Sequence, residues 1–552
     1  MKTSGGTQTH SLESLGHGSI LYLIGQIVLI GATFGSRVLL VKSLGAADYG
    51  NIALGISTVS VIIPLAAFGI PYGVTRQIAH SKTATERYTF MILALEIMIP
   101  VGVLAGAALF LVAPFMAAFV GDSSLTVVLQ FFAAYLAINM VSGTLGALNQ
   151  GEEDMLPLAL FNMIVTPLLL LGFLLYFFHT GGSLILAILA YVLASAGGLI
   201  GLFVYTFRVE WSRMRQALSD RTPQFSHRLL RELLLFSAPL TMMGVASVVT
   251  GNVDVLVLGF LGRFSSPTAA VSTVGMYSAV ITVARLLTLG VGAFAAILLP
   301  VAARLHKNEN TEELGRSYAT MTKWLLVLFV PLYTLFMAFP GPTILLIYGS
   351  DTGAFALAPS ILRITATGAI FTVLIGPAQS VLTGLGRLRL LFLDTVAAAS
   401  IDVVGSLLLV PTFGVTGASV AFAASTIALP FFAVLQTGLL AGVHPFQREV
   451  LLPLGVYSIV VGIGFGIPIL LLGWFPGTVT LAVLFFVLLL LYLGVVLATR
   501  STEAEDLYLL GVFERYLGRE IAFLHRVILR FEGRPRVSGP KVYEREESDL
   551  AP

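Results

Sequence analysis

Long apolar runs separated by short polar stretches dominate the chain. A helix needs about 20 residues to cross a hydrocarbon core of roughly 30 Å, and fourteen segments are long and apolar enough to do so. The pattern therefore predicts an all-α polytopic membrane protein with about 14 transmembrane helices. We place these spans at 20–41, 52–74, 88–113, 125–148, 158–178, 184–206, 234–261, 273–299, 322–345, 357–385, 392–410, 416–442, 451–474 and 478–499.

Composition agrees with this class. Of the 552 residues, 57% are hydrophobic and 11% are charged, whereas soluble domains carry about 25% charged residues. The sequence has no cysteine, which excludes disulfides, thiolate metal ligands and a cysteine nucleophile. No small-residue cleavage site follows the first apolar run, so we interpret this run as a retained first helix.

The distribution of lysine and arginine predicts the orientation. If the amino terminus is cytoplasmic, 26 of the 31 Lys and Arg residues fall in predicted inner segments. Only Lys42 and Arg263 fall in outer loops, and three arginines lie inside spans. Because cytoplasmic loops retain positive charge, this asymmetry predicts that the N and C termini are both cytoplasmic.

Two halves of the sequence resemble each other. The stretch "LGAADYGNIALGISTVS…PYGVTRQIAH" is similar to "LGRFSSPTAAVSTVGMYSAVITVAR…LPVAARLHK", and the two close on Arg76 and Arg304, each with a His soon after. A second pair, "GALNQGEEDMLPLALFN" and "VLTGLGRLRLLFLDTVA", recurs at a similar offset. We therefore predict two six-helix lobes related by duplication, plus two extra helices.

The pattern divides the chain into six parts. In the C-terminal part, residues 500–552, apolar residues recur on one helical face over 505–531 and arginines on the opposite face. This pattern predicts an amphipathic helix. This helix either packs on the protein body or docks a partner. The parts are a cytoplasmic N-terminal segment 1–19, an N-lobe 20–206, a basic cytoplasmic linker 207–233, a C-lobe 234–442, helices 13 and 14 at 451–499 and a cytoplasmic tail 500–552.

No catalytic constellation occurs in the sequence. It has no HExxH, no GxxxxGK[ST] loop and no GxSxG elbow, so we expect no enzyme activity and no direct ATP hydrolysis. We also expect no cofactor, no metal site and no nucleic-acid partner. The energy for transport then comes from an ion gradient, the membrane potential or the substrate's own gradient.

Charged residues inside predicted spans are the candidate functional residues. Such charges cost about 2.5 to 3.5 kcal/mol at a helix centre and usually face a bundle interior or a wet cavity. We take the arginines as substrate-binding candidates and three of the acids as ion-coupling candidates. The arginines are Arg285, Arg37 and Arg363, and the acids are Asp254, Asp402 and Glu96.

Arg285 is the deepest of these charges. It lies about twelve residues from either end of the span 273–299, too far for its side chain to reach an interface. One interpretation is a buried structural pair with Asp254 on the preceding span. The other is a cavity for an anion, because a guanidinium binds phosphate oxygens with two parallel hydrogen bonds and stays charged.

Simpler roles are open for the other charges. Arg37 lies in the last turns of its span, where a long side chain reaches the outer interface. Arg363 lies two turns inside its span, and Glu96 is close enough to the inner end to be hydrated. A further acid, Asp394, is expected to form a local ion pair with the arginines at 387 and 389.

Three stretches carry a family resemblance. They are "LVKSLGAADYGNIALGISTVSVIIPLAAFGI", "VGMYSAVITVARL" and "LLLVPTFGVTGASVAFAAS", which share Leu-Gly, Tyr-Gly and Pro-x-x-Gly-x-x-Gly-Ala patterns. In these patterns the chain resembles the polysaccharide transporter family over Leu15 to about Arg500. These are the O-antigen-type flippases of the multidrug, oligosaccharidyl-lipid and polysaccharide exporter superfamily.

The resemblance implies a mechanism and a site. It implies two lobes around a central V-shaped cavity, alternating access, and transport of polyprenyl-phosphate- or polyprenyl-pyrophosphate-linked sugars from the cytoplasmic to the outer leaflet. It also implies that cationic residues of the spans 20–41 and 273–299, here Arg37 and Arg285, line the cavity. Asp402 departs from the family pattern, since relatives often carry Asn in that region, so its role as an ion ligand stays open.

The sequence therefore favours a multi-pass cell-membrane flippase for lipid-linked oligosaccharide. It would serve surface polysaccharide synthesis or protein glycosylation, with membrane lipids and the polysaccharide-assembly or glycosylation machinery as partners. One alternative is an ion-coupled drug or cation exporter of the same superfamily, against which the deep arginine counts. The other is a membrane-embedded glycosyltransferase or polymerase, against which the short outer loops count.

Overall fold

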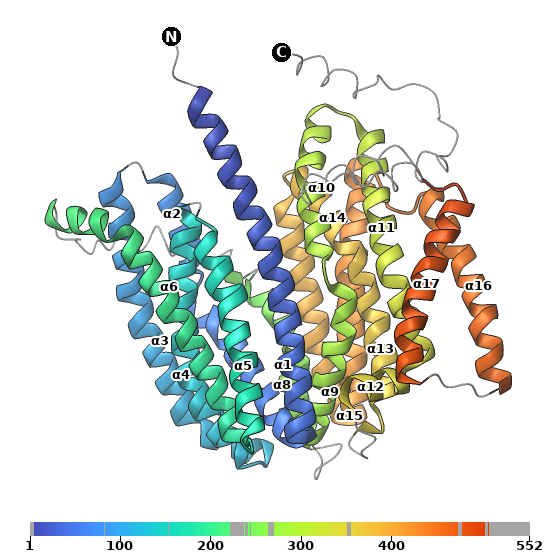
Figure 1. Cartoon of the computed structure of the whole chain (residues 1–552), viewed down its shortest axis with the longest axis horizontal. Coiled ribbons are helices and arrows are strands. Elements are labelled where there is room, and N and C mark those ends of the chain that lie inside the picture. The colour runs from blue at the N-terminus through green and yellow to red at the C-terminus, as the bar shows by residue number, and fades with distance from the viewer. Residues whose placement is uncertain are drawn as a thin grey trace.

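The computed structural model shows an all-helical protein (Figure 1), as the sequence predicted. The residues that it describes form helices and their connections and contain no β-sheet. The described residues are 5–81, 83–152, 154–220, 237, 241–242, 244–262, 270–349, 355–472, 477–502 and 506.

The helices of the first half pack side by side on one side of the molecule (Figure 1). They are α1 Gly5–Ala67, α2 Ile70–His80, α3 Ala84–Val120, α4 Ser124–Gly151, the π-helix η1 Leu158–Val165, α5 Thr166–His179 and α6 Leu184–Asp220.

The helices of the second half form the other side, with α16 and α17 at its edge (Figure 1). They are α8 Val253–Leu261, α9 Ala270–Ala284, the 3-10 turn η3 Arg285–Thr288, α10 Val291–Lys307, α11 Thr311–Ala338, α12 Pro340–Tyr348, α13 Ala358–Phe371, the 3-10 turn η5 Thr372–Leu374, α14 Ile375–Gly384, α15 Leu388–Ala441, α16 Arg448–Leu472 and α17 Thr478–Ala498.

Two of these elements are helical hairpins rather than single rods. A straight helix of the 63 residues in α1 would be about 95 Å long, yet α2, which follows after two residues, lies at the same end of the molecule as the amino terminus (Figure 1). The chain reverses at Gly45, whose φ of 78° is in the region that favours glycine. The predicted spans 20–41 and 52–74 are the two limbs.

Contacts between its two limbs show that α15 is a helical hairpin. Gln436 Nε2 donates to Asp394 Oδ1 at 2.6 Å, and a Cβ added to Gly405 would lie 3.1 Å from Ala421 Cβ. Both pairs are centred near Gly414, which has a φ of 55°. Antiparallel limbs follow, and they correspond to the predicted spans 392–410 and 416–442.

The described helices are long and apolar enough for a multi-pass membrane protein, which confirms the predicted class. Ten of those in the described ranges qualify, or eleven if Gly244–Thr250 and Val253–Leu261, bent by 54°, form one span. In that count α1 and α15 are one helix each. The total of fourteen spans and the cytoplasmic placement of both termini stay predictions.

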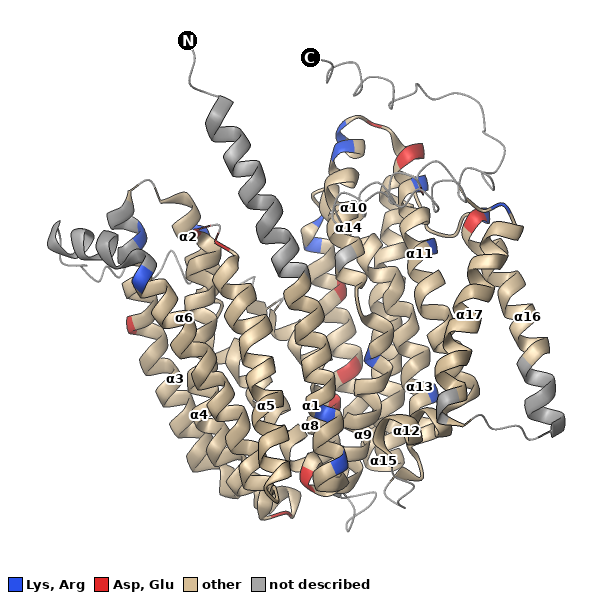
Figure 2. Ribbon diagram, viewed as in Figure 1, with Lys and Arg blue, Asp and Glu red and all other residues tan. Residues whose placement is uncertain are grey.

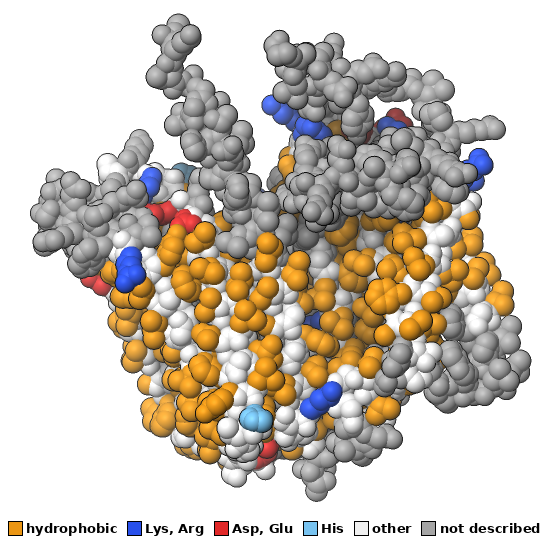
Figure 3. All heavy atoms as spheres, viewed as in Figure 1, with side chains coloured by type: hydrophobic (Ala, Val, Ile, Leu, Met, Phe, Trp, Pro, Cys, Tyr) orange, Lys and Arg blue, Asp and Glu red, His pale blue; other side chains and the backbone are white. Residues whose placement is uncertain are grey.

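The surface of the described part matches a membrane setting. Apolar side chains cover the middle of the face shown in Figure 3, and Lys, Arg, Asp and Glu gather mainly toward the two ends, apart from a group near α1 and α8 (Figure 2). On α3, Val103, Leu104, Leu111 and Phe115 are between 58% and 76% exposed. Such a face is stable only against lipid tails.

The two halves meet through a reciprocal backbone contact between α1 and α9. A Cβ added to Gly50 would meet the carbonyl oxygen of Val271, and one added to Gly275 would meet that of Ala46. The residues of each equivalent pair are 225 positions apart, close to the offset of the predicted repeat. Equivalent residues contact each other in this way around a two-fold axis, so the contact supports the predicted duplication.

Two predicted segments differ in the structure, and a third lies almost wholly outside the described residues. The span 273–299 is not continuous, because α9 ends before η3 and α10 starts after Gly290, whose φ is 81°. Residues 207–220 of the predicted linker continue helix α6, and 221–233 lie outside the described residues. The amphipathic helix predicted over 505–531 lies outside them too, except for Asp506. The lobe and tail boundaries stay predictions.

Candidate functional site

Arg285 lies at a break between two helices. It opens the short turn η3, which leads through extended Leu289 to left-handed Gly290 before α10 begins. A second break precedes α8, where the helical residues 244–250 and α8 are bent by 54°. Broken helices in transporters leave backbone groups free at membrane depth, and such places host binding sites.

The two breaks are joined by the Arg285 side chain. Its Nη2 donates to the carbonyl oxygen of Gly251 at 2.6 Å. This carbonyl lies at the bend before α8, so the guanidinium satisfies an acceptor that the interrupted helix leaves open. The backbone therefore holds the half-buried Arg285 in place, and this bond uses one of its five N–H donors.

Asp254 is fully buried in the first turn of α8. The Tyr277 hydroxyl of α9 donates to its Oδ2 at 2.6 Å, and the N–H of Val255 donates to Oδ1 at 2.8 Å. Its charge lies within electrostatic range of Arg285. The hydrogen bonds of Asp254 thus go to tyrosine and backbone, and Arg285 bonds Gly251 rather than forming the direct pair that was one interpretation of the sequence.

Asp402 is the least satisfied charge of the group. It is 0% exposed on α15, and among the described residues neither carboxylate oxygen has a hydrogen-bond partner. One turn later the Ser406 hydroxyl is equally buried and equally unpartnered. Asp402 lies within electrostatic range of Asp254 and Arg285. A buried carboxylate in this state takes up a proton or a cation, because an isolated charge is too costly.

Arg37 joins the same group from α1. Its Nη1 donates to Thr282 Oγ1 at 3.0 Å, and Thr282 lies one turn before Arg285 on α9. The charges of Arg37 and Arg285 act on each other. Two guanidinium groups at short range repel unless an anion lies between or beside them. The structure thus brings together Arg37, Arg285, Asp254 and Asp402.

Two other candidates are not brought into this group. Arg363 is exposed on α13, and its Nε donates at 2.9 Å to the carbonyl oxygen of Met337 in the last turn of α11, where a cation suits the helix end. Glu96 is exposed on α3. Their predicted functional roles stay predictions.

The local ion pair expected for Asp394 is wrong. The side chain is buried, Oδ1 accepts from Gln436 and Oδ2 has no partner. Arg387 and Arg389 are exposed at the start of α15. The helical hairpin turns Asp394 toward the opposite limb, away from the arginines that are near it in sequence.

Sequence reasoning missed the groups that hold the charges. Tyr277 and Thr282 lie in "VGMYSAVITVARL", where they count as ordinary members of an apolar span. Their hydroxyls at 277 and 282 were the available signal, since a buried hydroxyl needs a partner. The third group is the backbone carbonyl of Gly251, which the pattern of side chains along the sequence does not indicate.

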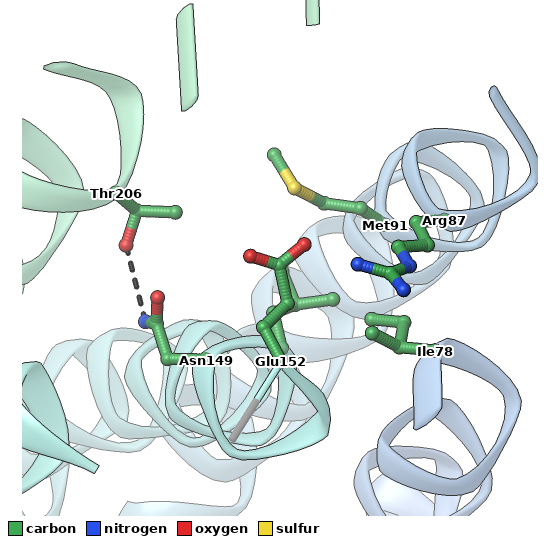
Figure 4. A pocket seen from close by; sticks show the side chains of 7 residues that line it. Ile78, Arg87, Met91, Asn149, Glu152 and Thr206 are labelled. Atoms are coloured by element: carbon green, nitrogen blue, oxygen red, sulfur yellow. Dashed lines mark hydrogen bonds between the residues drawn. The ribbon is translucent and has the colours of Figure 1, made fainter. Parts of the chain in front are cut away.

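A separate small pocket lies between the last turns of α2 and α4, the start of α3 and the interior of α6 around Thr206 (Figure 4). Asn149 Nδ2 donates to Thr206 Oγ1 at 3.1 Å, and the charged groups of Arg87 and Glu152 border the same space. None of the predicted site residues lines it. Its lining residues are Ile78, Arg87, Met91, Leu148, Asn149, Glu152 and Thr206.

Comparison with known proteins gives one family and one fold. A sequence family described as "Polysaccharide biosynthesis protein" matches residues 15–306. The uncharacterized membrane protein YabM of Bacillus subtilis (strain 168) is 26% identical over 374 residues, which are 66% of this chain and 69% of YabM.

Two solved structures share the fold. The lipid II flippase MurJ, in an inward closed conformation, aligns with a TM-score of 0.65 and 13% identity over 91% of this chain and 99% of that chain. An inward-facing multidrug resistance MATE family transporter of the MOP superfamily aligns with a TM-score of 0.63 and 15% identity over 77% of this chain and 98% of that chain. At these identities the likeness concerns the fold alone.

Proposed function

Since this chain belongs to the polysaccharide biosynthesis protein family, we propose that it is a flippase for a lipid-linked oligosaccharide. The substrate would be a polyprenyl-phosphate- or polyprenyl-pyrophosphate-linked sugar, moved from the cytoplasmic to the outer leaflet by alternating access. It would feed surface polysaccharide synthesis or protein glycosylation. The fold supports this proposal, because a lipid II flippase shares it over almost its whole length.

The proximity of Arg37 on α1 to Arg285 on η3 carries the proposal. Thr282 accepts from the first and lies one turn before the second, and the two charges are within electrostatic range of each other, which supports one shared phosphate site. Phosphate oxygens match the planar fork of a guanidinium, and two forks match a diphosphate. The same pair counts against a cationic drug as the substrate, because it would repel one.

We further propose that Asp402 and Asp254 couple transport to an ion. Asp402 is buried without a hydrogen-bond partner, and Asp254 lies within its electrostatic range. A proton or a monovalent cation would remove one negative charge from this pair, and the gain or loss of that ion would change the charge balance next to Arg285. Binding of ion and phosphate would then be linked through one set of charges.

Reconstitution in vesicles tests the transport proposal. A fluorescent polyprenyl pyrophosphate is added to the outer leaflet of the vesicles. A membrane-impermeant reductant quenches only the lipid that remains in this leaflet, and the fraction of lipid that it can reach is followed with time. Wild-type protein should accelerate the loss of accessible lipid, whereas Arg37→Ala with Arg285→Ala should not. An equal rate for vesicles with wild-type protein and for protein-free vesicles would contradict the proposal.

A further inference from the structure

The open face of α4 differs from a lipid-facing surface. Tyr135, Asn139 and Ser142 are partly exposed on it, and Gly143 is exposed. On the neighbouring helix α3, the exposed positions include large apolar side chains such as Leu104 and those around it. Polar groups are costly in hydrocarbon, so this face of α4 is turned toward water or ligand rather than lipid tails.

The three polar residues form one row. Positions 135, 139 and 142 are four and three residues apart, which places them on the same side of a helix. Asn139 Nδ2 donates to the carbonyl oxygen of Tyr135 at 2.8 Å, and Ser142 Oγ donates to Asn162 Oδ1 at 3.2 Å. The Asn162 amide extends the row onto η1, a π-helical segment of a type that is frequent at functional sites.

The first residue of the row, Tyr135, belongs to an aromatic cluster. Tyr135 and Tyr191 both lie within electrostatic range of the Arg37 guanidinium. Their rings pack edge to face, with centroids 6.1 Å apart, and Phe132 lies 5.3 Å from the Tyr135 ring. An aromatic cluster therefore leads into a row of neutral hydrogen-bonding groups on α4, and the Arg37 cation lies within electrostatic range of the cluster.

This order matches the chemistry of a glycosyl phosphate. The phosphate needs cationic donors, whereas the sugar needs neutral donors and acceptors for its hydroxyls. A pyranose ring also presents C–H groups that pack on an aromatic face. Among the described residues, Asn139 keeps its amide oxygen beyond its bonds to the Tyr135 carbonyl and hydroxyl, and Asn162 keeps its amide N–H groups beyond the bond it accepts from Ser142.

We propose that Tyr135, Asn139, Ser142 and Asn162 form a subsite for the sugar next to the phosphate of the transported lipid. The subsite rests on the proposed function, because Arg37 fixes the phosphate from which the sugar extends. Arg37 and Arg285 would recognise the phosphate, which all such lipids share. The polar residues of α4 would recognise the sugar, which differs among them. The polar face of α4 is then the determinant of sugar specificity.

Binding of two lipids to the full-length protein tests this subsite. The probes are polyprenyl pyrophosphate and the same lipid carrying one N-acetylhexosamine, each titrated into purified protein in nanodiscs. Loss of two hydrogen bonds in Asn139→Ala with Ser142→Ala should weaken binding of the sugar-bearing lipid by about tenfold. Binding of the bare lipid should stay unchanged. Tyr135→Phe keeps the ring and should weaken the sugar-bearing lipid by less.

Matched controls separate the subsite from the fold. Thr144 is buried on α4, and its hydroxyl donates to Met140 of the same helix, so Thr144→Ala should leave binding of both lipids unchanged. Melting temperature and elution volume report whether each variant is folded. Arg285→Ala should weaken both lipids equally, which is the signature of the phosphate site.

Each other result overturns a specific claim. Equal weakening of both lipids by the α4 variants, or no weakening, overturns the sugar subsite and leaves the flippase proposal intact. If the wild-type protein binds both lipids equally, the sugar subsite is likewise overturned and the flippase proposal is left intact. A wild-type protein that binds neither lipid overturns the proposed function and the subsite that rests on it.

Discussion

Lys323 Nζ lies 2.7 Å from Asp506 Oδ2, and both side chains are buried. Trp324 Nε1 donates to the other carboxylate oxygen, and Lys323 also donates to the carbonyl oxygen of Ser501. Lys323 belongs to α11, whereas Asp506 lies eight residues beyond the end of α17. The ion pair therefore fastens the start of the C-terminal tail to α11. It also shows that a lysine counted as a cytoplasmic charge has a structural role.

Breaking this pair should destabilise the protein. Asp506→Ala leaves a buried ammonium without its carboxylate, and such changes cost about 3 to 5 kcal/mol. A double change, Lys323→Met with Asp506→Leu, removes both charges and should recover most of the loss. Melting temperatures in detergent measure the effect, with Lys307→Met at the exposed end of α10 as the control. If Asp506→Ala melts like the wild type, the pair contributes no net stability.

Cysteine labelling should place the two ends of the bundle on opposite sides of the membrane. The chain has no native cysteine, so Thr180→Cys and Asn308→Cys each provide one thiol without background. Both positions are exposed, and the α5–α6 and α10–α11 connections lie at opposite ends of the molecule (Figure 1). An impermeant maleimide should label Thr180→Cys from outside and leave Asn308→Cys unlabelled. The reverse result would invert the predicted topology.

Substitution of the paired glycines should weaken the contact between α1 and α9. A Cβ at Gly50 or Gly275 would overlap a backbone carbonyl of the partner helix, so Gly50→Ala and Gly275→Ala should each lower the melting temperature. Because both changes disrupt one contact, the double variant should lose less than the sum. Gly172→Ala on α5 is the control, since a Cβ there meets nothing within 4 Å. Additive losses would show that the two glycines act independently.

The spans were predictable because lipid imposes a length and a polarity on each helix. Apolar runs of about 20 residues and short polar breaks are enough to find them, even where α15 continues through its reversal at Gly414. The break after Arg285 was not predictable in this way. The sequence around it stays apolar, and the interruption is seen only in the backbone, as the turn η3, extended Leu289 and Gly290 with a φ of 81°.

The candidate site was predictable only in part. Arg37, Asp254, Arg285 and Asp402 stand out as charges in apolar spans, and the structure brings them together. Their partners do not stand out, because these are a tyrosine, a threonine and a backbone carbonyl. Asp394 shows the converse error, since proximity in sequence suggested arginine partners whereas the α15 hairpin supplies a glutamine.

Removal of Arg285 should mainly affect transport, whereas removal of the Tyr277 hydroxyl should mainly affect stability. Tyr277 donates to buried Asp254, so Tyr277→Phe leaves a buried acceptor unsatisfied and should cost about 1 to 3 kcal/mol. Arg285→Ala should abolish lipid translocation, and it should lower the melting temperature no more than Tyr277→Phe does, because Asp254 keeps its tyrosine and only the Gly251 carbonyl loses a donor. Arg285→Lys should retain part of the transport, since the charge survives without the bidentate fork. Tyr176→Phe, at an exposed position of α5, is the control for the tyrosine.

One double variant separates binding from structure. If Arg285 serves only to balance Asp254, then Arg285→Ala with Asp254→Ala should recover both protein level and translocation. If Arg285 binds phosphate, the double variant should stay inactive at normal abundance. Translocation and abundance measured on the same membranes give the answer, and an active double variant would contradict the phosphate site.

Asp402→Asn should uncouple transport from the ion gradient without harming the fold. The native carboxylate is buried with both oxygens unpartnered, so an uncharged amide of the same shape should leave the melting temperature equal or higher. Translocation in vesicles should then become independent of imposed sodium and pH gradients. Asp394→Asn is the matched control, because Asp394 is also buried on α15 but bonded to Gln436, and its response to the gradients should stay that of the wild type. If Asp402→Asn still responds to a gradient, coupling lies at another group, and Asp254 is then the next to neutralise because it shares the electrostatic environment of Asp402 and Arg285.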